Sequence, residues 1–289
     1  NDFFKFSLQT ISMKFHSKSD SVEVDTDCVY FKGDVPCDPH KEKGVKCRCE
    51  FYKKRGKRIL IIKLGAMGDV IRTTPLTRKL REVYPNCEIT WVTNYPEVLE
   101  DAADTVINFN SKEINQVLAD YFDIMYNLDK DREACSLANL ANAELKKGFF
   151  LKNGKCHPID KDAHHKFLTG IFDDESKKNK LSYQHEIFQI AGFEFSDEKY
   201  ILKKKQFKWN LPDKKTNKII GINTGGGDRW TSRLWPEEKW IEMSKILIEN
   251  NYTPLLLGGE QEDSKNKKIA KDSEQFTQVT FHWINSSHS

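Results

Sequence analysis

The sequence predicts an α/β protein with two doubly wound parallel sheets, and the same three-part pattern supports each of them. A short apolar run, a glycine turn and a helical pattern follow one another at 58–84 and again from residue 218 onward. Short apolar runs also alternate with helix-length segments between residues 88 and 128. Strands that alternate with helices form βαβ units, in which the strands are parallel and helices cover both faces of the sheet.

The first sheet is expected to begin with a strand at 58–64, whose Ile and Leu residues are typical of a strand buried on both faces. Apolar spacing predicts a helix at 69–84, and Pro75 inside it is expected to kink its first half. Similar patterns predict strands at 88–93, 105–109 and 122–128, helices at 96–101, 112–120, 137–146, 163–172 and 183–191, and a charged loop at 173–180.

The second sheet is expected to start with a strand at 219–223, followed by a glycine-rich loop at 224–233 and a helix at 236–249. A strand at 252–257 and a helix at 260–271 continue the pattern, and the residues from 275 resemble a ragged tail. Roughly 70 residues are few for an independent doubly wound domain, so we expect this domain to be incomplete, truncated at its C-terminus. The predicted parts are an irregular cysteine-containing segment at 1–57, a first domain at 58–202, a linker at 203–217 and a partial second domain at 218–289.

Composition argues against a nucleic-acid partner and against a membrane span. The 46 basic and 43 acidic residues leave a net charge of only +3, and the two kinds are interspersed. No stretch approaches the ~18 apolar residues of a membrane-spanning helix, and no signal peptide precedes the first strand. We therefore expect a cytoplasmic protein.

The turn after the first strand carries Gly65, Gly68 and Asp69. Ligands of open α/β sheets bind beyond the carboxyl ends of the strands, where glycines allow close approach and a helix N-terminus offers free N–H groups. Asp69 there is a candidate general base toward a sugar hydroxyl. The simpler interpretation, favoured by spacing alone, is a tight turn whose helix is capped by Asp69. A nicotinamide dinucleotide site fits poorly, because the spacing is G-x-x-G rather than G-x-G-x-x-G.

The second glycine-rich loop is a candidate cradle for a diphosphate. It combines Thr224 and Gly225 with Arg229 and Arg233, whose guanidinium groups suit phosphate oxygens. It lacks the G-K-[ST] ending of a P-loop, and a surface loop without function explains it equally well. Glu260 begins the next predicted helix after a glycine pair, where its negative charge interacts favourably with the helix dipole. It is also a candidate for binding a ribose.

Two further groups of residues are candidates for function. Asp129 follows the predicted strand at 122–128 and suits contact with a sugar, although capping of the next helix by Asp129 or Asp131 is the preferred explanation. Four cysteines, Cys28, Cys37, Cys47 and Cys49, lie within 22 positions. In a cytoplasmic chain they favour metal over disulfides, but their spacing is not that of a standard zinc finger. Free thiols are therefore the first interpretation and a structural zinc site the second.

The motifs taken together resemble a known enzyme family. K-L-G-A-M-G-D-V-I-R-T-T-P-L at 63–76 and Y-P-N-C-E-I-T-W at 84–91 resemble the N-terminal signature of glycosyltransferase family 9, the ADP-heptose:lipopolysaccharide heptosyltransferases. W-P-E-E-K-W at 235–240 and L-L-L-G-G-E at 255–260 resemble motifs of that family's second domain. The resemblance extends over roughly 57–272.

This resemblance implies a GT-B architecture, in which an acceptor domain and a nucleotide-sugar domain, both Rossmann-like, face a cleft. It implies an inverting, metal-independent transfer that needs no cofactor, from an ADP-heptose-like donor to a lipopolysaccharide-core or other glycan or glycolipid acceptor. It also implies peripheral association with the cytoplasmic face of the inner membrane. Asp69 matches the family's base, and its turn with Gly65 and Gly68 is expected on the acceptor side. Asp129 is expected on the same side from its position after the strand at 122–128. Arg233 matches a residue on the donor phosphates.

Two departures from the family pattern define the alternative. The sequence shows no D-x-G-x-x-H-like segment of the kind that helps hold the donor, and the cysteine segment is foreign to the best-known heptosyltransferases. The alternative function is a non-catalytic nucleotide- or glycan-binding module, or an inactive truncated relative.

Overall fold

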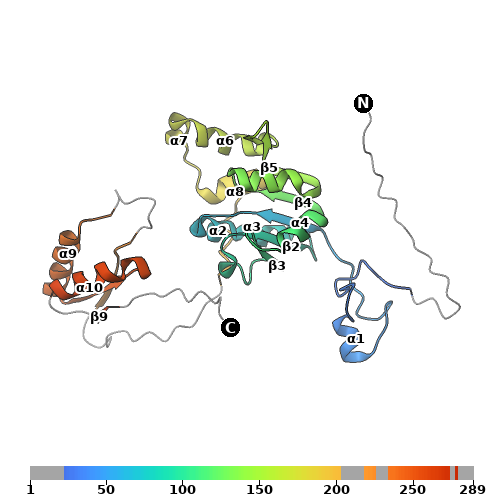
Figure 1. Ribbon diagram of the computed structural model, residues 1–289, viewed down its shortest axis with the longest axis horizontal. Coiled ribbons are helices and arrows are strands. Elements are labelled where there is room, and N and C mark those ends of the chain that lie inside the picture. Colours follow the sequence, from blue (N-terminus) through green and yellow to red (C-terminus); the bar gives the residue numbers. More distant parts are fainter. Residues whose placement is uncertain (1–22, 203–217, 226–233, 274–276, 279–289) are drawn as a thin grey trace. The chain divides into compact units, whose positions relative to one another are not determined.

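The computed structural model describes residues 23–202, 218–225, 234–273 and 277–278 and divides the chain into two compact units, Asn1–Lys204 and Lys205–Ser289 (Figure 1). Both units consist of helices and mainly parallel strands, so the predicted α/β class is confirmed. None of the helices in these ranges is long and apolar enough to cross a membrane.

A six-stranded sheet in the order β3-β2-β1-β4-β5-β6 organises the first unit. All neighbouring strands are parallel except β5 and β6, which form an antiparallel hairpin. The strands are β1 (Arg58–Ile62), β2 (Glu88–Thr93), β3 (Thr105–Asn108), β4 (Tyr121–Asn127), β5 (Asn142–Lys152) and β6 (Lys155–Pro158).

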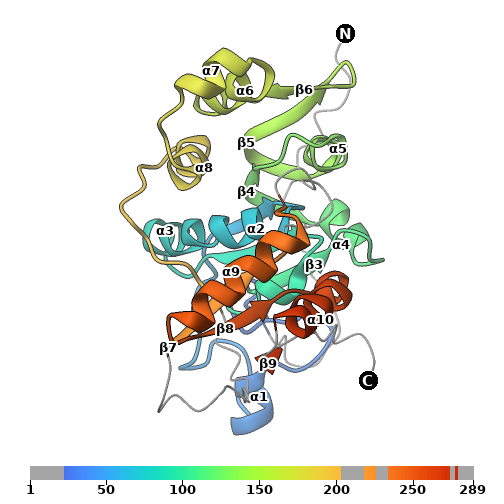
Figure 2. The same ribbon diagram turned by 90° about the vertical axis from the view of Figure 1, so that its left-hand side faces the viewer.

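Helices cover both faces of this sheet (Figure 2). Ile59 and Ile61 of β1 face the core under α2, α3 and α8, whereas Leu60 and Ile62 face the core under α4 and α5. Burial on both faces explains why the strand is apolar at successive positions instead of alternating. The helices are α2 (Met67–Thr73), α3 (Pro75–Val83), α4 (Ile114–Ala119), α5 (Arg132–Leu140) and α8 (Tyr183–Ala191).

Three sequence-based expectations need correction in this unit. The helix expected at 69–84 is two helices, since Pro75 starts α3 and Thr74 separates it from α2. The helix expected at 137–146 ends at Leu140, because the following residues pair with β4 as strand β5. The charged loop expected at 173–180 contains the helix α7 (Asp173–Lys178). Shorter helices are η1 (Pro96–Val98), η2 (Lys161–Ala163) and α6 (His164–Ile171).

The described part of the second unit contains three parallel strands in the order β7-β8-β9, with the helices α9 and α10 packed on them. Ile222, Leu256 and Ile269 form its buried apolar centre. The elements are β7 (Lys218–Asn223), α9 (Glu237–Glu249), β8 (Tyr252–Leu257), η4 (Glu260–Glu262), α10 (Asp263–Asp272) and β9 (Thr277–Gln278).

The segment ahead of β1 is irregular over its described residues, as predicted. It contains one short helix, α1 (Asp38–Lys43), and one isolated antiparallel bridge between Cys28 and Lys54. The proposed linker at 203–217 lies outside the described residues.

Candidate active site

The site predicted in the first unit lies where the strand order reverses. Strand β1 pairs with β2 on one side and with β4 on the other, and all three run parallel. The chain therefore moves outward from β1 through β2 and β3 and then crosses back to β4. The carboxyl ends of β1 and β4 flank a topological switch point, which is the usual ligand position in an open α/β sheet.

A buried ion pair between Lys63 and Asp129 joins these two strand ends. Their side chains are 4% and 8% exposed. Asp129 also accepts backbone N–H groups from Leu64 at 2.5 Å and from Gly65 at 3.4 Å, and Lys63 donates to the carbonyl of Gly65. The Asp129 carboxylate thus fixes the backbone of the turn after β1 through these hydrogen bonds.

Burial raises the pKa of Asp129 above its ordinary value, against the opposing charge of Lys63 and the Leu64 N–H. Such an enclosed carboxylate is suited to shaping the turn rather than to exchanging protons with a ligand. Of the two residues expected to cap the next helix, Asp131 occupies the N-cap position of α5, without a side-chain capping hydrogen bond, and Asp129 does not.

Asp69 is the accessible carboxylate of this turn. It lies in the first turn of α2, whose N-cap is Ala66, so the interpretation of Asp69 as the capping residue is wrong. Its side chain is 34% exposed and forms an ion pair with Arg72. A Cβ added to Gly68 would contact nothing within 4 Å, so the surface of the turn beside Asp69 is open.

Tyr183 of α8 contacts Arg72, the residue that pairs with Asp69. The guanidinium carbon of Arg72 lies 4.1 Å from the centre of the Tyr183 ring, a cation–π contact. Burial raises the pKa of Tyr183, so its hydroxyl stays protonated, and it hydrogen-bonds with Thr73. Arg72 and Tyr183 were not predicted from the sequence. Arg72 lies within the 63–76 motif, three residues after Asp69 on the same helix, but its pairing with Asp69 was not foreseen. Tyr183 carries no motif, and only the packing of α8 on α2 brings it to Arg72.

In the second unit, Thr224 and Gly225 follow β7 beside the glycine pair that follows β8. Thr224 is fully buried, and its hydroxyl donates to Asn266 Oδ1 at 2.5 Å. Lys265 donates to the carbonyl oxygen of Thr224 at 2.6 Å. Two residues of α10, neither singled out from the sequence, therefore fix the end of β7.

Glu262 occupies the space between the two glycine turns. A Cβ on Gly225 would lie 2.3 Å from Glu262 Oε1, and one on Gly258 would lie 2.5 Å from Glu262 Cβ. Glu262 also accepts the Gly259 N–H at 2.8 Å. Close packing therefore favours glycine at both positions whether or not a ligand binds, more strictly at Gly258, where the contact is with Cβ, than at Gly225, where the Glu262 side chain can move.

The other predicted donor-side residues are placed less fully. Arg229 and Arg233 lie outside the described residues. Glu260 begins η4, but its side chain also lies outside the described part of the chain.

The cysteine segment brings its four predicted thiols to one cavity of about 320 Å³. Cys28, Cys37, Cys47 and Cys49 all line it and all are free thiols. Among the described residues, no three His, Cys, Asp or Glu side chains are already arranged as ligands of one metal ion. Zinc binding therefore stays a prediction.

Comparison with known proteins identifies the fold. No family model and no curated protein matches the chain. Among solved structures, a family 9 glycosyl transferase from Veillonella parvula DSM 2008 is 20% identical, with 78% of this chain and 69% of that chain covered and a TM-score of 0.56.

Two Escherichia coli structures are also similar. The heptosyltransferase WaaC with ADP is 16% identical, with 78% of this chain and 74% of that chain covered and a TM-score of 0.51. The ADP-heptose LPS heptosyltransferase II is 15% identical, with 77% and 72% covered and a TM-score of 0.52. The expected likeness to the heptosyltransferases is thereby confirmed at the level of the fold.

Proposed function

We propose that this chain is a glycosyltransferase that moves a heptose or related sugar from a nucleotide-sugar donor to a glycan or glycolipid acceptor. The observation that carries the proposal is the accessible Asp69 carboxylate, held by Arg72 at the switch point of a sheet shared with heptosyltransferases. A carboxylate there is suited to receive a proton from a hydroxyl that lies beyond the strand ends.

The proposed reaction is a single inverting displacement that requires no metal. The acceptor hydroxyl oxygen forms a bond to the anomeric carbon while the bond from that carbon to the nucleotide diphosphate breaks on the opposite face. Asp69 takes the hydroxyl proton, and the leaving diphosphate carries away the bonding electron pair. The ring of Tyr183 stacks on Arg72 and restricts its side chain, and Arg72 in turn pairs with Asp69. Both are therefore positioning residues.

The second unit is proposed to bind the nucleotide. Thr224 and Gly225 end β7 beside the turn that follows β8, at the same strand edge where open α/β sheets bind ligands. Arg229 and Arg233 are proposed to neutralise the diphosphate, and Glu260 to contact the ribose. The structural likeness to WaaC, which was solved with ADP, supports an adenine nucleotide as the donor's carrier.

The acceptor is proposed to be a lipopolysaccharide core or another cell-envelope glycan. Such acceptors are assembled on a lipid, so we place the protein in the cytoplasm, in peripheral contact with the inner membrane. The enclosed Lys63–Asp129 pair is proposed to keep the acceptor-side turn, including Gly65 and Gly68, in its binding shape.

The test is transfer by Asp69→Asn, measured as nucleotide release from ADP-heptose in the presence of lipopolysaccharide-core acceptor. Loss of the base should lower turnover by at least ~100-fold. Donor affinity, measured by calorimetry, should stay unchanged. Asp131→Asn is the matched control, since it neutralises an exposed carboxylate at a neighbouring strand end that forms no capping bond. Near-normal turnover by Asp69→Asn would contradict the mechanism, and ADP binding without turnover by the unaltered chain would favour the non-catalytic alternative.

A further inference from the structure

The described residues ahead of β1 form a closed loop with almost no core of its own. Val29 donates to the carbonyl of Lys53 at 2.8 Å, and Arg55 donates to that of Asp27 at 2.7 Å, so the two ends of the loop are joined. Between residues 23 and 57, Pro39 is the single fully buried residue. Segments of this size usually require disulfides, a metal ion or a partner to hold one structure.

The four cysteines face inward where most of their neighbours face water. Cys28, Cys37, Cys47 and Cys49 are each partly buried. Burial alternates along Cys47, Arg48 and Cys49, with the arginine exposed between two partly buried thiols. Both cysteines of this C-x-C pair line the cavity.

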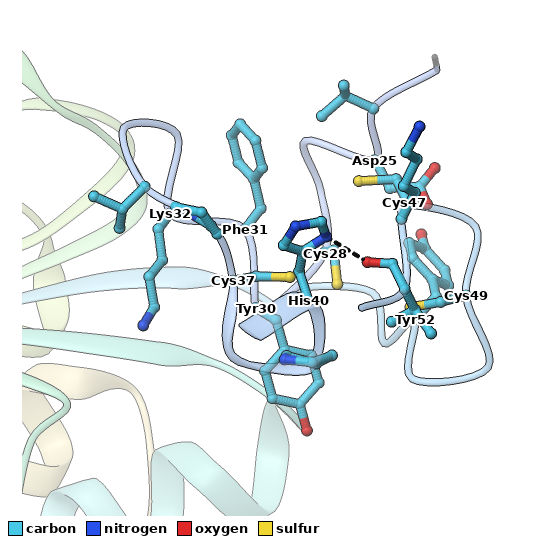
Figure 3. Close-up of a pocket in the computed structure, with 16 residues that line it drawn as sticks. Asp25, Cys28, Tyr30, Phe31, Lys32, Cys37, His40, Cys47, Cys49 and Tyr52 are labelled. Carbon is cyan, nitrogen blue, oxygen red and sulfur yellow. Dashed lines mark hydrogen bonds between the residues drawn. The ribbon is translucent and has the colours of Figure 1, made fainter. Parts of the chain in front are cut away.

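The cavity gathers these thiols from distant positions of the loop (Figure 3). Cys28 lies at the closed base, opposite Lys54. Cys37 precedes α1, and the C-x-C pair follows it. Figure 3 shows Cys28 and Cys37 beside His40, with Cys47 and Cys49 on the neighbouring part of the loop.

His40 braces the loop between the two pairs of cysteines. Its Nδ1 lies 2.7 Å from the carbonyl oxygen of Val45. Because a carbonyl oxygen only accepts, Nδ1 carries the proton in this contact. The bond ties α1 to the stretch of chain that leads into Cys47, which keeps the two halves of the cavity together.

We propose that Cys28, Cys37, Cys47 and Cys49 bind one Zn²⁺ as four thiolates and that this ion, rather than an apolar core, holds residues 23–57 in shape. Four soft thiolates in a tetrahedral shell are a preferred ligand set of zinc. Binding replaces the four S–H protons by the metal, and the protons pass to solvent. The cysteines turn their sulfurs into the cavity to complete the shell.

Charge around the cavity suits this ion. Four thiolates and one Zn²⁺ leave a net charge of −2, which needs nearby cations in a site open to water. Lys46 and Lys32 line the same cavity and are such cations, although Lys32 also pairs with Asp38 and the carboxylate of Asp25 belongs to the same lining. The proposed ion lies in a separate segment from Asp69 and takes no part in sugar transfer, so the inference stands whether or not the proposed function is correct.

The first experiment is elemental analysis of the full chain, purified without a metal-binding tag and without added metal. About one zinc per chain is expected. Absence of metal, or iron in place of zinc, overturns the assignment. Cys47→Ser and Cys49→Ser should each lose the metal, whereas Cys156→Ser, which removes a thiol outside the cavity, should keep it.

A second measurement covers variants that fail to fold. The unaltered chain is stripped with a chelator under reducing conditions and titrated with Co²⁺. Four thiolates should give an intense thiolate-to-cobalt charge-transfer band that saturates at about one equivalent and disappears when Zn²⁺ is added. A spectrum of hydrated Co²⁺ throughout the titration overturns the proposal.

Discussion

At the scale of single residues, the pair of Lys63 and Asp129 is the most enclosed charged contact of the candidate site. Lys63→Met leaves the Asp129 carboxylate buried without its cation. We expect the free energy of unfolding to fall by about 3–5 kcal/mol, because an unpaired buried charge is strongly destabilising. Urea unfolding followed by circular dichroism measures this loss.

Two controls separate the buried charge from the side chain itself. Adding Asp129→Asn to Lys63→Met should restore more than half of the lost stability, because the amide oxygen still accepts the Leu64 N–H without a charge. Lys178→Met removes a largely exposed ion-pair partner and should cost less than about 1 kcal/mol. A double variant no more stable than Lys63→Met alone would contradict the explanation.

The thiol of Cys156 should be alkylated at a lower pH than an ordinary cysteine. Its pKa lies below the usual value because its interaction with the neighbouring Cys135 thiol and the Lys130 ammonium favour the thiolate. Since the thiolate is the nucleophile, the rate of iodoacetamide modification should reach half its maximum at a lower pH. Peptide mapping by mass spectrometry gives this rate for each cysteine.

A variant of Lys130 and the buried Cys87 serve as controls for the pH dependence of Cys156 modification. Lys130→Met should move the midpoint of Cys156 modification to higher pH, because the variant removes the cation that favours its thiolate. Burial raises the pKa of Cys87, which should stay unmodified over the same range. Identical midpoints in the unaltered chain and in Lys130→Met would show that Lys130 does not act on this thiol.

At the scale of elements, the hairpin of β5 and β6 shows what sequence reasoning missed. The residues at 142–147 contain Glu and Lys at helical spacing, which favoured a helix there. The sequence nevertheless contains a hairpin signal, the dipeptide Asn153-Gly154, which lies between the paired Lys152 and Lys155. Both turn residues have positive φ, at 52° and 72°. Pairing with β4 outweighed the local preference, and a sequence shows no such long-range partner directly.

Gly148 of β5 is expected to be intolerant of any side chain. Its φ is 98°, and an added Cβ would lie 1.8 Å from the carbonyl oxygen of Asn127 in β4. Gly148→Ala should therefore lower the unfolding free energy by at least about 2 kcal/mol, since strain and a backbone clash act together. The control is Gly68→Ala, whose added Cβ meets nothing within 4 Å, so that it should change stability by less than about 1 kcal/mol. Denaturant titration of both variants measures the two losses. Equal losses at the two positions would show that the contact with Asn127 is unimportant.

At the scale of the whole molecule, the succession of strand, glycine turn and helix was sufficient to predict the fold class. Each such unit carries its own local signals, so β1, β2, β7 and β8 appear in the sequence within a few residues of their observed bounds. The site was predictable only in part. Asp69 and Thr224 belong to motifs, and Arg72 follows Asp69 by three residues on α2, whereas Tyr183 and Asn266 reach the strand ends through helix packing. Their role depends on tertiary contacts that no local spacing encodes.

The last prediction concerns the proposal that the second unit, and not the first, binds the nucleotide. If the second unit binds the nucleotide, ADP should slow amide hydrogen exchange at 218–225 and 256–266 and leave 63–72 unchanged. With ADP at 100 times its dissociation constant, binding stabilises the bound form by about 2.7 kcal/mol, so exchange that needs opening of this site should slow roughly 100-fold. Thr224→Val removes the hydroxyl that donates to Asn266 and should weaken this protection, whereas Asp69→Asn should preserve it. Protection centred on 63–72 instead would place the nucleotide at β1 and reverse the assignment of the two units.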